Sequence, residues 1–204
     1  MLYRVLYLLC NFFFKILFRL KIEGSENVPR QGGFIVVSNH VSHLDPIILS
    51  ISLKRPIHFM AKEELFEIPV FGFIISRLNA FPVRRGSFDR KAIQNSLKLL
   101  DEEKVLGMFP EGTRSTDGKL NKPHHGPATF AYRVGVPIVP MGLIGTGEAL
   151  RKGTWLPKFK RIKVRIGEPL YFSKSSRVKI EKSDIIRASN EIMESISSLI
   201  KENE

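Results

Sequence analysis

A histidine and an aspartate five positions apart, His40 and Asp45, are the residues in this sequence whose types and spacing best suit acid–base chemistry. They lie within residues 39–45, which read N-H-V-S-H-L-D and directly follow a short apolar run. Imidazole is an effective general base near neutral pH, and a carboxylate can hold the ring in the useful tautomer and stabilise the cation that forms. The intervening residues are enough for a turn that folds Asp45 back onto His40. This pair therefore predicts a general base with an orienting carboxylate.

Two other interpretations of the same segment stay open. Asp45 precedes Pro46, and an aspartate before a proline is a common helix start, so the carboxylate could serve only as an N-cap. His43 lies three positions after the candidate base, and His124 with His125 could add further metal ligands. The sequence has neither an HExxH motif nor a Cys/His framework, so no metal is expected.

Groups suited to binding phosphate follow two other apolar runs. After residues 105–108 comes F-P-E-G-T-R, in which Gly112 permits close backbone approach and Arg114 offers a bidentate fork. Glu111 is placed to orient that arginine or a substrate hydroxyl. A pair of arginines at 84–85 forms a second candidate phosphate clamp, and Lys62 is a further cation after a predicted strand. Solvated surface charge is the alternative for each of these groups.

The elements that must position these residues follow from hydrophobic periodicity. Strands are predicted at 33–38, 57–61, 105–109, 137–144 and 161–166, the last at a sheet edge or with one wet face. Helices are predicted at 45–53, 68–76, 87–103 with Ser87 as N-cap, and 180–202. Strands alternating with helices predict an α/β fold, and the chemical groups cluster just after strands, where open α/β sheets place their sites.

The first 20 residues are strongly apolar and form a predicted helix. Arg4, Asn11, Lys15 and Arg19 recur at spacings of seven, four and four, which places them on one narrow helical face. This pattern favours a helix lying in a membrane interface with basic groups toward anionic headgroups. A spanning helix and a helix packed on the core are the alternatives, whereas a signal peptide lacks its small-residue cleavage site. The expected organisation is an interfacial helix at 1–22 followed by one domain at 23–204.

The overall charge restricts the partners without choosing among them. The chain of 204 residues has 32 Lys and Arg against 20 Asp and Glu, a net charge of +12, which attracts nucleic acid, anionic membranes or phosphorylated substrates. We find no nucleic-acid recognition motif and no aromatic residues interleaved with the basic ones, so nucleic acid is not an expected partner. A serine hydrolase is disfavoured because there is no GxSxG elbow. Cys10 is the only cysteine, which fits a reducing compartment.

In this order, these motifs resemble those of the glycerolipid acyltransferase family, and within it the bacterial 1-acylglycerol-3-phosphate acyltransferases. His40-x4-Asp45 is similar to the first motif of the family, and Phe81-x-x-Arg84 to the second. The segment 109–114 resembles the third motif, and V-P-I-V-P at 136–140 the apolar fourth. The resemblance covers residues 24–169. His43 departs from it, because relatives often have an aromatic residue there, and so does the segment 122–126, where a lysine usually lies nearer the glycine.

The resemblance implies a single mixed sheet flanked by helices and a site with defined roles. His40 would deprotonate the acceptor hydroxyl, Asp45 would orient it, and the alkoxide would attack an acyl thioester of acyl carrier protein or coenzyme A. The acceptor site would be formed by Lys62, Arg84, Glu111, Gly112, Thr113 and Arg114. The expected reaction acylates the sn-2 hydroxyl of lysophosphatidate to give phosphatidate, without a bound cofactor. Glycerol 3-phosphate, another lysophospholipid or a lipid-linked sugar is the alternative acceptor. The expected location is the cytoplasmic face of the cell membrane, as a peripheral or monotopic protein.

Overall fold

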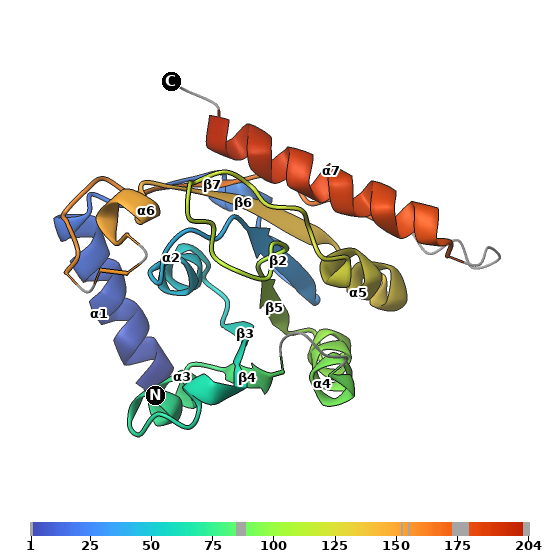
Figure 1. The fold of residues 1–204 in the computed structure, drawn as a ribbon, viewed down its shortest axis with the longest axis horizontal. Coiled ribbons are helices and arrows are strands. Elements are labelled where there is room, and N and C mark those ends of the chain that lie inside the picture. Colours follow the sequence, from blue (N-terminus) through green and yellow to red (C-terminus); the bar gives the residue numbers. More distant parts are fainter. Residues whose placement is uncertain (1, 85–88, 152, 155, 173–179, 202–204) are drawn as a thin grey trace.

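Seven strands form one mixed sheet in the computed structural model of the chain (Figure 1), which describes residues 2–84, 89–151, 153–154, 156–172 and 180–201, apart from the side chains of 2–5. The strand order across the sheet is β1-β7-β6-β2-β5-β3-β4, and neighbouring strands are parallel except for the antiparallel pair β6–β7. The strands are β1 (Lys21–Glu23), β2 (Phe34–Ser38), β3 (Ile57–Lys62), β4 (Ala80–Val83), β5 (Val105–Met108), β6 (Ile138–Ile144) and β7 (Lys163–Ile166). The α/β fold with a single mixed sheet is therefore confirmed.

Helices cover both faces of this sheet, as Figure 1 shows. The helices are α1 (Leu2–Leu17), α2 (Asp45–Ser52), α3 (Phe71–Arg77), α4 (Arg90–Asp101), α5 (Gly126–Val134), α6 (Thr146–Ala149) and α7 (Lys182–Lys201), with 3-10 turns η1 (Ser25–Asn27) and η2 (Glu63–Leu65). Strand β2 divides the core between the two faces because its side chains alternate. Phe34 and Val36 join a cluster with α1 and α2, and Ile35 and Val37 join one with α4, α5 and α7.

The parallel strands at the centre place their carboxyl ends at one edge of the sheet. Val37 of β2 lies opposite Met108 of β5, and Lys62 of β3 lies opposite Val83 of β4. The segments that follow these strands, which contain the predicted chemical groups, therefore leave the sheet in a row. This topology gathers groups that are more than 70 residues apart in the sequence, such as His40 and Glu111.

Several predicted elements differ from the structure at their ends or in their position. Strand β7 is not at an edge and does not have a wet face: β1 pairs beside it, and its last three residues are buried. The helix predicted at 68–76 begins only at Phe71. Ser87 lies outside the described residues, and the cap of α4 is Asp89, whose side chain accepts a hydrogen bond from the backbone N–H of Ala92. Elements β1, β4, α5 and α6 were not predicted.

Helix α1 packs on the core along one side and exposes apolar side chains on the other. Phe14 and Phe18, just beyond its end, are buried in the core, and α1 contacts α2. Its outer side exposes large apolar side chains, namely Leu8, Leu9, Phe12, Phe13 and Ile16, and the side chains of Lys15 and Arg19 are exposed as well. Within the described part of the chain, no helix is long and apolar enough to cross a membrane. The expected domain boundary at 22–23 falls inside β1, which belongs to the sheet.

Candidate active site

His40 and Asp45 are in direct contact where β2 ends and α2 begins. Nδ1 of His40 lies 2.8 Å from Oδ2 of Asp45, and the two residues are 9% and 0% exposed. The same Oδ2 accepts hydrogen bonds of 2.7 Å from the backbone N–H groups of Val41 and Ser42. Because a carboxylate can only accept, Nδ1 carries the hydrogen of the neutral ring, and Nε2 is left as the basic nitrogen.

The interpretation of Asp45 as an N-cap is wrong. Leu44 occupies the N-cap position of α2, Asp45 is the first helical residue, and no side chain caps the helix. The carboxylate instead turns back over residues 40–42, which precede it in the sequence. Its second oxygen, Oδ1, is buried and has no hydrogen-bond partner among the described residues. The side chain of Asp45 thus serves the turn that presents His40, rather than the helix that follows.

Glu111, at the end of β5, holds the backbone of His40 in place. Its Oε1 accepts a 3.0 Å hydrogen bond from the backbone N–H of His40, and its Oε2 accepts from both the backbone N–H and the side-chain Nδ2 of Asn121. On the other side of the same residue, the N–H of Ser115 donates to the carbonyl oxygen of His40 at 2.8 Å. The segment after β5 therefore fixes both polar backbone groups of His40.

Phe109 packs flat against the imidazole of His40. The ring centroids are 3.9 Å apart with an interplanar angle of 16°, and Phe59 of β3 stacks more distantly on Phe109 at 6.2 Å. These contacts prevent the imidazole from rotating away from Asp45. Together with the backbone contacts, they give His40 one fixed orientation before any substrate binds.

Arg114 and His43 are the next ionisable side chains beside this pair. Nη1 of Arg114 is buried without a hydrogen-bond partner in the described structure, so this cation has unused bonding capacity. Burial lowers the pKa of His43 below its usual range, and the positive charge of Arg114 lowers it further, against the opposing effect of Asp45. His43 is consequently neutral at neutral pH in the free protein. A phosphate bound at Arg114 would favour its protonation.

Gly112 and His124 are in close contact beside these groups. Gly112 has φ +69°, and a Cβ there would lie 2.8 Å from Nε2 of His124, so only glycine fits. His124 is in turn held by its backbone N–H, which donates to the carbonyl oxygen of Pro110 at 2.8 Å. The neighbouring His125 makes a 2.9 Å contact with Ser189 of α7 instead. The described residues contain no group of three or more His, Cys, Asp or Glu side chains arranged to hold a metal ion.

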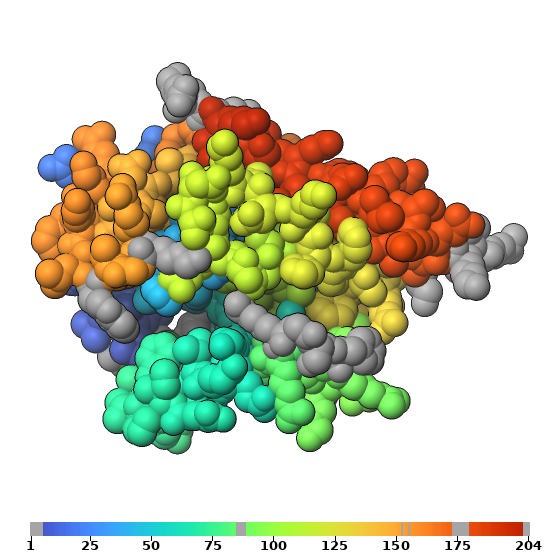
Figure 2. Space-filling model, viewed as in Figure 1, coloured from blue at the N-terminus to red at the C-terminus, as the bar shows by residue number. Residues whose placement is uncertain are grey.

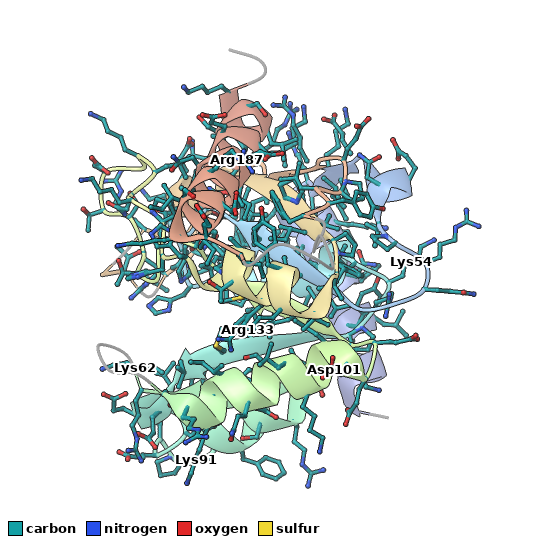
Figure 3. All side chains as sticks on the ribbon, turned by 90° about the vertical axis from the view of Figure 1, so that its right-hand side faces the viewer. Lys54, Lys62, Lys91, Asp101, Arg133 and Arg187 are labelled. Carbon is teal, nitrogen blue, oxygen red and sulfur yellow. The ribbon has the colours of Figure 1, made fainter. Side chains whose placement is uncertain are left out.

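The remaining predicted residues lie farther along the sheet edge. Lys62 pairs with Glu64 at 2.9 Å, and Nε of Arg84 pairs with Glu63 at 2.9 Å, all with exposed side chains. Figure 3 shows Lys62 at the outer rim of the lower half of the molecule, near β3 and β4. At the usual strand spacing, β4 lies roughly 14 Å from β2, three strands away. Thr113 is exposed, and Arg85 lies outside the described residues.

Two positioning contacts had no identifiable role in the sequence. Asn39 pairs with the backbone of Leu143 in β6, where Oδ1 accepts from its N–H at 2.8 Å and Nδ2 donates to its carbonyl at 2.9 Å. This amide extends the β2–β6 pairing by one side chain and fixes the residue before His40. Asn121, which holds Glu111, was not predicted either. Asn39 belongs to the segment that resembles the first motif of the family, which assigned it no contact, and no pattern marked Asn121.

Comparisons with known proteins agree with one another. The sequence profile of the Acyltransferase family matches residues 19–144. The chain is 35% identical over 153 residues to the 1-acyl-sn-glycerol-3-phosphate acyltransferase of Bacillus subtilis, covering 74% of each protein. It is 34% identical to the chloroplastic LPAT1 acyltransferase of Arabidopsis thaliana, of which it spans 45%. The crystal structure of the 1-acyl-sn-glycerophosphate acyltransferase PlsC from Thermotoga maritima superposes with a TM-score of 0.74 at 29% identity, over 95% of this chain and 78% of that one.

Proposed function

Because the chain belongs to the acyltransferase family, we propose that it acylates the sn-2 hydroxyl of lysophosphatidate to give phosphatidate in phospholipid synthesis. The acyl donor is a thioester of acyl carrier protein or coenzyme A. The observation that carries the proposal is the 2.8 Å contact between His40 and Asp45 in a site bordered by an unpaired arginine. The Bacillus subtilis relative, named 1-acyl-sn-glycerol-3-phosphate acyltransferase, and the solved structure of the Thermotoga maritima 1-acyl-sn-glycerophosphate acyltransferase support the choice of acceptor.

The proposed reaction begins at Nε2 of His40, for which the described residues offer no hydrogen-bond partner. Nε2 removes the proton from the sn-2 hydroxyl as its oxygen attacks the thioester carbonyl carbon. The tetrahedral intermediate then collapses, the carbon–sulfur bond breaks, and the thiolate takes the proton back from Nε2. Asp45 stabilises the imidazolium while it exists, and Phe109 keeps its ring in the plane required for both proton transfers.

The acceptor phosphate binds first to Arg114 in this proposal. Its buried and unpaired Nη1 is available for a charge-assisted bond, whereas Lys62 and Arg84 must leave exposed ion pairs to reach the ligand. Gly112 and Thr113 form the wall of the acceptor site. We assign Glu111 a positioning role, because both of its oxygens are occupied by His40 and Asn121.

We also propose that α1 lies in the membrane interface on the cytoplasmic face, with its exposed apolar side toward lipid. Phe14 is buried in the core, and Tyr7, Cys10 and Leu17 pack partly against it, so the helix is joined to the catalytic domain. Figure 2 shows a hollow between the segment around α3 (teal) and the segments above it. Helix α3 exposes apolar side chains, including Phe71, Phe73 and Ile74, which suit the acyl chains.

The decisive test compares His40→Ala with a histidine substitution away from the site. His125→Ala is the matched control, because its ring contacts α7 rather than the reacting groups. With lysophosphatidate and either thioester, we expect His40→Ala to lose at least about a hundredfold in kcat while keeping its fold and its membrane binding. His125→Ala should retain activity. Normal turnover by His40→Ala would rule out the mechanism.

A second comparison tests the phosphate site. Arg114→Ala should raise the KM for lysophosphatidate roughly 10- to 150-fold, the effect of losing one charged hydrogen bond, with little change in the KM for the donor. Arg133→Ala, an exposed arginine of α5 labelled in Figure 3, is the control and should change neither constant. An unchanged acceptor KM for Arg114→Ala would remove this residue from the site.

A further inference from the structure

The connection between α6 and β7 combines exposed apolar and basic side chains, and we call residues 151–161 the basic loop. The sequence has no acidic residue from 149 to 167. Among the described residues of the loop, the exposed cations are Arg151, Lys158, Lys160 and Arg161. Leu156 is 85% exposed and Phe159 is 64% exposed. Large apolar side chains interspersed with cations are unfavourable in water but suit an anionic lipid interface.

One end of the basic loop packs against the end of α1. The ring of Phe159 meets that of Phe18 edge-on with centroids 5.6 Å apart, and Phe18 also lies 6.0 Å from the exposed Phe13. Backbone hydrogen bonds fix this junction, from the N–H of Ile162 to the carbonyl of Phe18 and from the N–H of Lys21 to the carbonyl of Ile162. Figures 1 and 2 show the segment (orange) beside α1 (blue). The exposed Phe159 of the loop and the exposed Phe13 of the helix therefore both pack on the same buried ring, that of Phe18.

The other end of the basic loop is tied to the turn that presents His40. Oγ of Ser42 donates to the carbonyl oxygen of Leu150 at 2.9 Å, and Gly147 packs against Val41 so closely that a Cβ would lie 3.3 Å from its side chain. A hydrogen bond of 2.7 Å from the N–H of Lys158 to the carbonyl of Ala149 closes the base of the loop. The loop thus connects the outer side of α1 to the active-site turn.

We propose that the basic loop is a second membrane contact, which inserts Leu156 and Phe159 into the interface of an anionic bilayer while its cations bind lipid phosphates. The inference rests on the proposed function, since it specifies how the lipid surface is met. One helix leaves the protein free to rotate about the helix axis on a membrane. A second contact at the end of α1, joined to Ser42, removes this freedom and turns the active-site mouth toward the bilayer.

An acidic protein such as a carrier protein is the competing partner for a basic surface. Two observations favour lipid. First, Leu156 and Phe159 of the loop are strongly exposed. Second, Phe159 packs beside the end of α1, which also exposes apolar side chains. Attraction between a basic loop and an acidic protein would not explain these exposed apolar side chains. Lipid phosphates and acyl chains together satisfy both kinds of side chain.

The experiment uses the full chain with vesicles of phosphatidylcholine, alone or with about 30% phosphatidylglycerol, because an anionic surface attracts polybasic segments. The variants are Leu156→Ser/Phe159→Ser and Lys158→Gln/Lys160→Gln. Matched controls are Ile186→Ser on α7 and Lys54→Gln/Lys91→Gln, which remove two exposed cations outside the loop, both labelled in Figure 3. Binding is measured by co-sedimentation and by emission of Trp155, the only tryptophan of the sequence.

For the wild type and both controls we expect tight binding to the anionic vesicles with a shift of tryptophan emission to shorter wavelength. Losing two cations should weaken this binding roughly 25-fold, at about fivefold for each charge near the surface. The apolar variant should lose the emission shift. Wild-type binding and emission in both loop variants would overturn the proposal.

Activity assays separate this inference from the proposed function. With a short-chain acceptor dispersed in water, both loop variants should turn over like the wild type, and with the acceptor in anionic vesicles they should be slower. If the loop variants instead lose activity only with the acyl carrier protein donor and keep vesicle binding, the loop binds the carrier and the membrane role is refuted. If the wild type acylates neither acceptor form, the proposed function fails, whereas the vesicle measurements still decide on the membrane contact.

Discussion

Replacing Asp45 by asparagine removes one charge from the site while its hydrogen bonds can be kept. Three donors converge on Oδ2, from His40, Val41 and Ser42, so the amide oxygen of asparagine should take this place. The NH2 group then occupies the position of Oδ1, which has no partner in the described structure even in the wild type. The two backbone N–H groups thus select the amide orientation that preserves the tautomer of His40. Asp45→Asn therefore isolates the electrostatic contribution to catalysis.

The size of this contribution follows from the 2.8 Å contact. A charge-assisted hydrogen bond exceeds a neutral one by about 1 kcal/mol. The Coulomb attraction of two unit charges 4 Å apart is about 4 kcal/mol at an effective dielectric constant of 20. These values bracket the stabilisation of the imidazolium, so kcat of Asp45→Asn should fall roughly 5- to 1000-fold. Asp45→Ala should be slower still, because it also leaves the ring without its orienting partner.

The two substitutions should differ in stability as well. Alanine leaves the N–H groups of Val41 and Ser42 without their acceptor, at about 1–3 kcal/mol each, which corresponds to a fall in Tm of roughly 5–20 °C for a domain of this size. Asparagine should stay close to the wild-type Tm. The assay measures kcat with saturating lysophosphatidate and donor, together with thermal unfolding. Wild-type turnover by Asp45→Asn would refute the electrostatic role, and equal Tm values for the two variants would refute the amide orientation.

Two further substitutions test the framework around the site. Glu111→Gln exchanges an acceptor for a donor at His40 or Asn121, so it should lower kcat and Tm while leaving the KM for the acceptor near the wild-type value; a selective rise in that KM would instead make Glu111 a substrate contact. Ion pairing with Lys21 and Lys163 lowers the pKa of Glu23 to about 2, from its ordinary value of 4.5. Its stabilising effect is therefore complete above pH 4.5 and is lost as the pH falls through about 2, so the Tm difference between wild type and Glu23→Gln should vanish toward pH 2; a difference independent of pH would contradict the ion-pair origin.

The central strands and long helices were predictable because their side-chain patterns are locally sufficient. β2 reads as a continuous buried run and α7 as an amphipathic helix, and both formed where the sequence placed them. The missed strands are three and four residues long. β1 depends on β7, more than 140 positions away, and β4 contains Pro82 and depends on β3. Their backbone pairing, rather than any pattern of their own, makes them strands, and this pairing also explains why β7 is not an edge.

In the candidate site, too, the residue types could be predicted from the local sequence, whereas the contacts between distant residues could not. A residue's chemical type is visible in the sequence, so His40, Asp45 and Arg114 could be proposed directly. What a side chain contacts is not visible, and Glu111 illustrates the difference. Its motif position suggested an interaction with substrate, but His40 and Asn121, 71 and 10 positions away, occupy its carboxylate. Only the parallel neighbours β2 and β5 bring Glu111 beneath the turn of His40.

For Asp45, the sequence allowed two roles, and the fold selects one of them. From the sequence, an aspartate before proline is equally suited to capping a helix and to orienting a base, since both roles need a carboxylate at a strand-to-helix turn. The direction of the side chain distinguishes the two roles. The carboxylate of Asp45 points back to residues 40–42, and Leu44 occupies the N-cap position. Pro46 then serves to start α2 without a side-chain cap, because it has no N–H group that would require one. The short helix therefore holds the backbone of Asp45 rigid, and its carboxylate serves His40 and the backbone of residues 41 and 42 instead of capping the helix.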